Sequence, residues 1–180
     1  MAHTSNNNSN TCFTPLKDWS CISVIGPDAV DFLQNQLTNS VKSIANTPAA
    51  SIATPHQQNR FAGYCSAKGR LMASFWITRQ DSAVGGANVE ATESQPAFYL
   101  FISKDLAATL AKRLSMFVLR SKVKVLDLTE SMDIYGYAAE TNESKDDLAK
   151  MVAMSGVISA ELPPVSINQV QTKRYLLAAP

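Results

Sequence analysis

The chain has 180 residues, of which 46% are hydrophobic and 17% are charged, a composition that supports one folded domain and excludes a wholly disordered chain. Its formal net charge of +1 neither favours nor excludes a nucleic-acid partner, and no run of about 18 apolar residues indicates a membrane span. Three cysteines, Cys12, Cys21 and Cys65, lack CxxC spacing, which argues against a disulfide framework or zinc knuckle and favours a reducing cytoplasm.

The N-terminal part predicts a polar tail followed by a strand and a helix. Residues 1–12 are expected to be disordered, and one domain is expected over 13–180. Residues 19–25 alternate in polarity and are rich in β-branched side chains, which predicts a strand. Pro27 and Asp28 suit the first turn of a helix. The apolar spacing that follows predicts that this helix continues to about 39–41.

A β-hairpin is expected next, with strands at 61–66 and 71–78 joined by the turn Lys68-Gly69-Arg70. A tight turn favours glycine, but it does not need a cation on each side of it. The two cations therefore suggest a place where an anionic group is held, although a solvated turn would carry the same residues.

The remaining pattern contains strands and helices in alternation. We expect a short strand at 51–54, an exposed loop at 81–96, a strand at 97–102, a helix capped by Ser103 and ending near Arg120, strands at 123–128 and 132–139, a helix at 144–154, a linker at Pro163-Pro164 and a strand at 174–178. Hairpins outnumber βαβ crossovers in this order. The fold class is therefore predicted as α+β, with a largely antiparallel sheet and flanking helices.

Catalytic motifs are absent from the sequence: no HExxH, GxSxG or P-loop occurs. His56 is interpreted as a surface histidine and Cys65 as a half-buried strand cysteine. Trp19 is either a core residue or an aromatic face on which a flat ring can stack. Gln34 begins an amide-rich run that either faces solvent or reaches a cleft.

A basic cluster surrounds the end of the long helix and consists of Lys112, Arg113, Arg120, Lys122 and Lys124. The helix dipole favours cations at this end and explains most of the cluster. A weak RNA-facing patch is the alternative interpretation.

Four segments together resemble the N-terminal part of the YgfZ folate-binding proteins, which belong to the glycine-cleavage T-protein superfamily. They are Asp18-Trp19, residues 25–29, residues 32–39 with the amide run, and residues 64–70 with the Lys-Gly-Arg turn. The resemblance covers residues 13–140 well and the remainder weakly. It implies a T-protein-like fold that binds tetrahydrofolate or a one-carbon derivative of it.

The resemblance also implies roles for particular residues. Trp19 matches the family's aromatic beside the folate, and Lys68, Gly69 and Arg70 match its hairpin motif. With Gln34, these are the candidate folate-binding residues; the cations suit the anionic glutamate tail and Trp19 suits the flat pterin. YgfZ-like proteins support iron–sulfur enzymes, including those that modify tRNA, so an accessory, non-catalytic role with such partners is expected.

Two departures from the family pattern limit the expected chemistry. The hallmark Lys-Gly-Cys-Tyr-x-Gly-Gln-Glu, which lies in the family beyond the position of Pro180, is absent. The chain is either an N-terminal fragment or a short member of the family that lacks the reactive cysteine. The aminomethyltransferase branch has carboxylates on the strand after the turn, where this chain has Ala73 and Ser74. No catalytic or metal-binding residue is therefore predicted. The alternatives are a folate-dependent aminomethyltransferase using Asp31 or Asp133, and a protein- or RNA-interaction module.

Overall fold

The computed structural model describes residues 11–83, 94–140, 145–154, 156–167 and 169–180. The helices are α1 (Ala29–Gln34), α2 (Lys104–Phe117) and α3 (Lys145–Val152). The strands are β1 (Thr11–Pro15), β2 (Trp19–Ile25), β3 (Asn59–Cys65), β4 (Leu71–Arg79), β5 (Ser82–Ala83), β6 (Ser94–Gln95), β7 (Ala97–Ser103), β8 (Lys124–Asp127), β9 (Asp133–Glu140), β10 (Ile158–Ile167) and β11 (Val170–Ala179).

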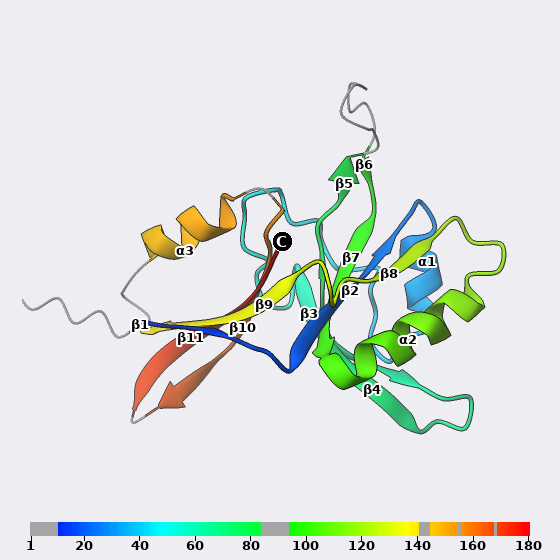
Figure 1. Ribbon diagram of the computed structural model, residues 1–180, viewed down its shortest axis with the longest axis horizontal. Coiled ribbons are helices and arrows are strands. Elements are labelled where there is room, and N and C mark those ends of the chain that lie inside the picture. The colour runs from blue at the N-terminus through cyan, green and yellow to red at the C-terminus, as the bar shows by residue number, and fades with distance from the viewer. Residues whose placement is uncertain (1–10, 84–93, 141–144, 155, 168) are drawn as a thin grey trace, which may run out of the picture.

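These strands form two main antiparallel sheets (Figure 1). Sheet A has the order β1-β9-β11-β10, and sheet B has the order β3-β4-β7-β2-β8. Strands β5 and β6 form a separate two-stranded ribbon. Every pairing between the described strands is antiparallel. The α+β class with antiparallel sheets is thus confirmed, with the strands divided between two sheets.

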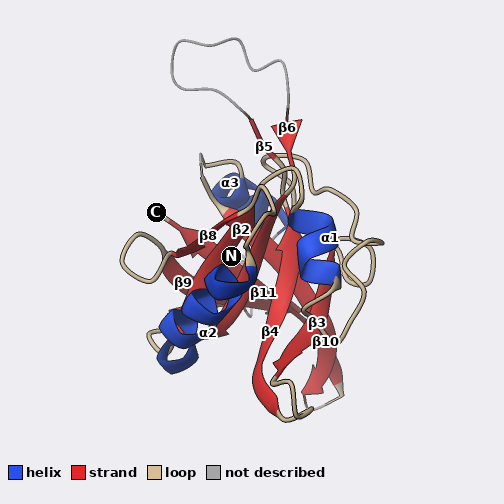
Figure 2. Ribbon diagram, turned by 90° about the vertical axis from the view of Figure 1, so that its right-hand side faces the viewer, coloured by secondary structure: helices blue, strands red, loops and turns tan. Residues whose placement is uncertain are grey.

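Helices α1 and α2 cover one face of sheet B (Figure 2). The alternation in β2 sends Ile22 and Val24 toward these helices and Cys21 to the opposite face. Helix α2 meets the sheet with a stripe of buried residues at helical spacing: Ala107, Leu110, Ala111 and Leu114. The alternation in β2 and the helical spacing in α2 explain why the sequence predicts these two elements.

The opposite face of sheet B packs against sheet A. Cys21 and Phe101 come from sheet B and join Ile134 and Leu176 of sheet A in one buried cluster. The other face of sheet A carries Tyr137 and Tyr175, and it packs against Leu148 and Val152 of α3. The molecule is therefore layered as α1 and α2, sheet B, sheet A and α3.

Asn59, at the start of β3, connects the two sheets through backbone groups. Its Nδ2 donates to the carbonyl oxygens of Ala53, at 3.0 Å, and of Glu161, at 2.7 Å. The backbone N–H of Glu161 donates in turn to the Ala53 carbonyl at 2.9 Å. The loop before β3 is thereby joined to β10 of sheet A.

Most sequence-based elements are present, with shifted ends. Strand β2 and the hairpin β3–β4 are confirmed, as are β7 and the helix that begins after Ser103. Ser103 occupies the N-cap position but makes no side-chain capping hydrogen bond. Helix α2 ends at Phe117, earlier than the expected Arg120. In the expected loop at 81–96, β5 and β6 occupy the two ends and residues 84–93 lie outside the described residues.

Four expectations are wrong. The expected short strand at 51–54 does not form, and only Ala53 makes an isolated bridge, to Ala160. Residues 11 and 12 belong to β1, which pairs with β9, while residues 1–10 of the expected tail lie outside the described residues. Helix α1 ends at Gln34, because the following backbone turns to β3 and Thr38 N–H donates to the Gly63 carbonyl. Pro163 and Pro164 lie within β10, where the register shifts on the edge of sheet A. An edge strand with an irregularity tolerates residues that have no N–H.

Candidate functional site

A pocket of about 300 Å³ lies where β3 and β4 approach β10. Its volume is at the lower end of the roughly 300–1,000 Å³ typical of small-molecule sites. The lining combines aromatic, amide and cationic side chains with two prolines: Asn39, Pro55, His56, Asn59, Arg60, Phe61, Trp76 and Pro163. We call this the aromatic pocket.

Phe61 and Trp76 form its aromatic part. The two residues are opposite one another in the β3–β4 ladder, so their side chains share a face. Their ring centroids are 5.2 Å apart and the rings are tilted by 57°. Phe61 remains 52% exposed. An exposed ring beside a pocket provides a surface on which a planar ligand can stack.

Two buried polar atoms of the pocket-lining residues have no hydrogen-bond partner among the described residues. They are Asn59 Oδ1, an acceptor, and Arg60 Nε, a donor. Since Asn59 Nδ2 is fixed by two carbonyl oxygens, the orientation of the amide is determined. Buried polar atoms are normally paired, so these atoms offer hydrogen bonds to a ligand.

The other polar residues of the pocket are tied to the backbone. Asn39 Nδ2 donates to the Phe61 carbonyl at 3.2 Å, and Arg60 donates through its terminal nitrogen to the His56 carbonyl at 3.2 Å. His56 is exposed, as the sequence predicted, and its φ of 66° is a left-handed conformation that non-glycine residues rarely adopt. These contacts hold the rim of the pocket.

The turn Lys68-Gly69-Arg70 lies elsewhere, at the exposed tip of the hairpin. The turn is closed by Gly69 N–H, which donates to the Ser66 carbonyl at 2.8 Å, and Gly69 has a φ of 75°. Lys68 and Arg70 border an open depression of about 620 Å³ together with Arg113 of α2. This basic depression shares no lining residue with the aromatic pocket.

Gln34 has a local structural role. Its Oε1 accepts hydrogen bonds from Ser40 Oγ at 3.1 Å and from the backbone N–H of Val41 at 3.0 Å and Lys42 at 3.3 Å. The side chain therefore fixes the segment that follows α1. It lines neither the aromatic pocket nor the basic depression.

Trp19 is partly buried at the first position of β2, opposite Ser103 of β7. It packs on the cluster between the two sheets, as other partly buried residues such as Leu16 and Leu128 also do. Trp19 also lines neither depression. The structure thus places the five candidate folate residues in three locations.

No family model matches the chain, but comparisons with known proteins identify similar sequences and a similar fold. It is 24% identical over 145 residues to the "iron-sulfur cluster assembly factor IBA57 homolog, mitochondrial" of Dictyostelium discoideum, which covers 76% of this chain and 34% of that protein. It is 38% identical over 65 residues to the "tRNA-modifying protein YgfZ" of Edwardsiella ictaluri, which covers 36% of this chain and 17% of that protein.

A solved structure shows the same fold. The glycine cleavage system aminomethyltransferase T from Bartonella henselae matches with a TM-score of 0.61 and 13% identity, over 96% of this chain and 42% of that chain. The chain therefore has a T-protein-like fold, and its sequence is similar to those of IBA57 and YgfZ proteins. It spans 34% and 17% of the lengths of the two sequence relatives.

Aminomethyl transfer was expected to need carboxylates, and no carboxylate lines the aromatic pocket. Ala73 is buried in the helix-side core, and Ser74 is exposed on the same strand as Trp76. Asp31 pairs with Lys42 at 3.1 Å on the surface, and Asp133 begins β9 opposite Ala179. The described residues also contain no group of three or more His, Cys, Asp and Glu side chains suited to a metal ion. Among the residues that line the pocket, the exposed His56 has a side chain of the type that acts as a general acid or base.

Sequence reasoning missed most of the aromatic pocket. Phe61 and Trp76 each lie on an expected strand, and their cross-strand pairing follows once the hairpin register is known. The sequence predicts a linker at Pro163 and gives no reason to place it beside these two aromatic residues.

The helices of the described residues were compared with the length and apolar character that a membrane span requires, and none of them meets both requirements.

Proposed function

We propose that the chain is an accessory folate-binding domain that serves the maintenance of iron–sulfur enzymes, including enzymes that modify tRNA. The observation that carries this proposal is the aromatic pocket, which combines the Phe61–Trp76 pair with the unpaired buried atoms of Asn59 and Arg60. The absence of a carboxylate from its lining supports binding rather than group transfer.

The chemistry of a reduced folate fits these residues. Phe61 and Trp76 would stack on the flat pterin, Asn59 Oδ1 would accept a hydrogen bond from a pterin N–H, and the Arg60 guanidinium would favour an anionic group. When bound, tetrahydrofolate carries one-carbon units on its nitrogens. The roles of Trp19, Gln34, Lys68, Gly69 and Arg70 in folate binding stay predictions, which the same titration tests.

The printed names of the relatives support the choice of clients. One relative is an iron–sulfur cluster assembly factor and another is a tRNA-modifying protein. A cytoplasmic location stays a prediction, because the Dictyostelium relative is named as mitochondrial. Cell fractionation tests the location. Activity of iron–sulfur enzymes in cells depleted of this protein tests the clients.

Calorimetric titration with 5-formyl-tetrahydrofolate tests the pocket. We expect saturable binding by the intact chain, weakened by about 1–3 kcal/mol in Phe61→Ala because stacking area is lost. Phe61 is half exposed, so this variant keeps its folded core. If both turn cations make charge-assisted hydrogen bonds to the glutamate tail, Lys68→Ala/Arg70→Ala will weaken binding by a similar 1–3 kcal/mol or so.

The two variants separate the two locations. If only Phe61→Ala loses folate affinity, the site is the aromatic pocket, and Lys68 and Arg70 are solvated turn residues without a role in binding. Loss only in the turn variant would move the site to the basic depression. Absence of binding to the folded chain would contradict folate binding by these 180 residues.

A further inference from the structure

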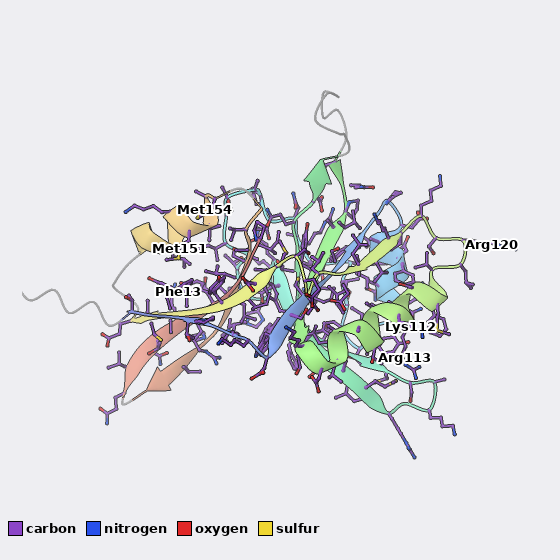
Figure 3. The ribbon with its side chains drawn as sticks, in the orientation of Figure 1. Phe13, Lys112, Arg113, Arg120, Met151 and Met154 are labelled. Atoms are coloured by element: carbon purple, nitrogen blue, oxygen red, sulfur yellow. The ribbon has the colours of Figure 1, made fainter. Side chains whose placement is uncertain are left out.

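We propose that the end of α2 and the turn after it bind an acidic protein segment that carries apolar anchor side chains. The surface consists of three cations, Lys112, Arg113 and Arg120, interleaved with Met116, Phe117 and Leu119. Figure 3 shows Lys112, Arg113 and Arg120 at the end of the molecule remote from α3. We call it the basic–apolar surface; it is separate from the aromatic pocket.

Helical spacing places charge and apolar area side by side. Lys112 and Met116 are four residues apart on α2, as are Arg113 and Phe117, so each pair shares a face. None of these four belongs to the buried stripe that packs on sheet B. The exposed fractions are 66% for Met116, 49% for Phe117 and 87% for Leu119. Three large apolar residues within four positions form a patch that folding alone does not require.

Pairing with carboxylates does not explain the three cations, and the helix dipole does not explain Lys112 and Arg113. Among the described residues, no carboxylate pairs with Lys112, Arg113 or Arg120. The last turn of α2 contains no basic residue, so Lys112 and Arg113 lie before the region where the dipole acts most strongly. The basic depression extends the same charge from Arg113 to Lys68 and Arg70.

The turn after α2 holds its apolar residue in place. Leu119 has a φ of 37°, an unfavourable conformation for a residue with a side chain. The turn is nonetheless closed by Ser121 N–H, which donates to the Val118 carbonyl at 2.7 Å, and by Lys122 N–H, which donates to Asp28 Oδ2 at 2.7 Å. Glycine or asparagine would suit Leu119's conformation better, so the exposed leucine is consistent with a contact residue.

The composition of the surface favours a protein partner over RNA. Arginine, methionine and aromatic residues are enriched at the centres of protein interfaces. An RNA backbone would use the cations, but exposed aliphatic side chains such as Met116 and Leu119 would contribute little to it. Charge complementarity then requires that the partner segment be acidic.

The test uses a fluorescent synthetic peptide in which glutamates alternate with leucines and phenylalanines, titrated into the full chain. We expect saturable binding that weakens as salt is raised. The variant Lys112→Glu/Arg120→Glu should weaken binding about tenfold or more, and Met116→Gln/Leu119→Gly should weaken it about fivefold. Glycine suits the φ of residue 119, so the second variant retains its fold.

The matched control is Lys17→Glu/Lys104→Glu, which changes net charge equally at exposed positions away from this surface. An equal loss of affinity in this control would overturn the proposal, because it would show nonspecific charge attraction. Undiminished binding of a peptide with serine in place of every apolar residue would also overturn it. So would tighter binding of oligouridylate than of the peptide, or no peptide binding at all. Folate titration of the same variants keeps this test separate from the pocket.

Discussion

Cys21 differs from the other two cysteines in its surroundings. It is fully buried between the sheets, whereas Cys12 is exposed and Cys65 is half-buried at the end of β3, as the sequence predicted for Cys65. Burial raises the pKa of the Cys21 thiol from 9.0 to about 12, and the nearby Asp127 carboxylate acts in the same direction. Cys21 is therefore a neutral core residue at physiological pH and is a poor nucleophile.

This pKa predicts alkaline destabilisation. In the unfolded chain the Cys21 thiol ionises near its ordinary pKa of 9.0, while in the folded chain it stays protonated to about pH 12. The raised pKa thus contributes stability that is present below pH 9 and lost as pH rises toward 12. Urea unfolding across this range should show a steeper loss in the native chain than in Cys21→Ala. Native-state alkylation by iodoacetamide of Cys21 as fast as of Cys12 would contradict the burial on which this rests.

The turns depend on two glycines in different ways. At Gly26, between β2 and α1, an added Cβ would lie 2.1 Å from the Lys122 carbonyl oxygen, and φ is 149°. At Gly69, in the hairpin turn, φ is 75° but an added Cβ would meet nothing within 4 Å. The first glycine allows close contact between two backbone segments; the second supplies only a backbone conformation.

We therefore expect unequal effects of alanine at these two positions. Gly69→Ala should destabilise the fold by about 1 kcal/mol, the usual cost of a left-handed alanine. Gly26→Ala should cost about 3 kcal/mol or more, because the turn after α2 must also move away. Thermal or urea unfolding of both variants measures the difference. If the two variants have equal free energies of unfolding, the turn after α2 moves away from residue 26 with no loss of stability.

Local patterns predicted the elements whose signal lies within themselves. The apolar stripe of α2 and the alternation of β2 are such signals, and both elements were found. Strand β1 was missed because its five residues are all exposed and its identity depends on pairing with β9. Pro163 was misassigned for a similar reason, since the tolerance of β10 for proline follows from its place at the edge of sheet A.

The candidate site was predicted less well than the elements. The family resemblance predicts one folate site formed by Trp19, Gln34 and the Lys68-Gly69-Arg70 turn. The structure places these residues in three separate locations. The aromatic pocket requires contacts between β3 and β10, which are far apart in the sequence. Local sequence patterns do not predict which distant strands contact one another, so the pocket can be identified only from the tertiary structure.

At the scale of the whole molecule, Asn59 forms a polar link between the two sheets. We expect Asn59→Ala to lower the free energy of unfolding by about 1–3 kcal/mol, because the Glu161 carbonyl loses the amide donor and the Ala53 carbonyl keeps only the Glu161 N–H. The control is Asn39→Ala, which removes an exposed amide-to-carbonyl hydrogen bond and should cost less than about 1 kcal/mol. Urea unfolding compares them. Similar losses would show that the sheets are held together by their apolar contacts alone.

The division of strands between the sheets also sets an order in which the chain can fold during synthesis. All five strands of sheet B have left the ribosome once Asp127 is clear of it, whereas sheet A needs β11, which ends at Ala179. Strand β1 must wait for its partner, since Thr11 pairs with Ala139. Non-local pairings of this kind form late and slowly. A nascent chain with sheet B already folded would expose Cys21 and Phe101 until sheet A covers them, which makes this interval the one most prone to aggregation.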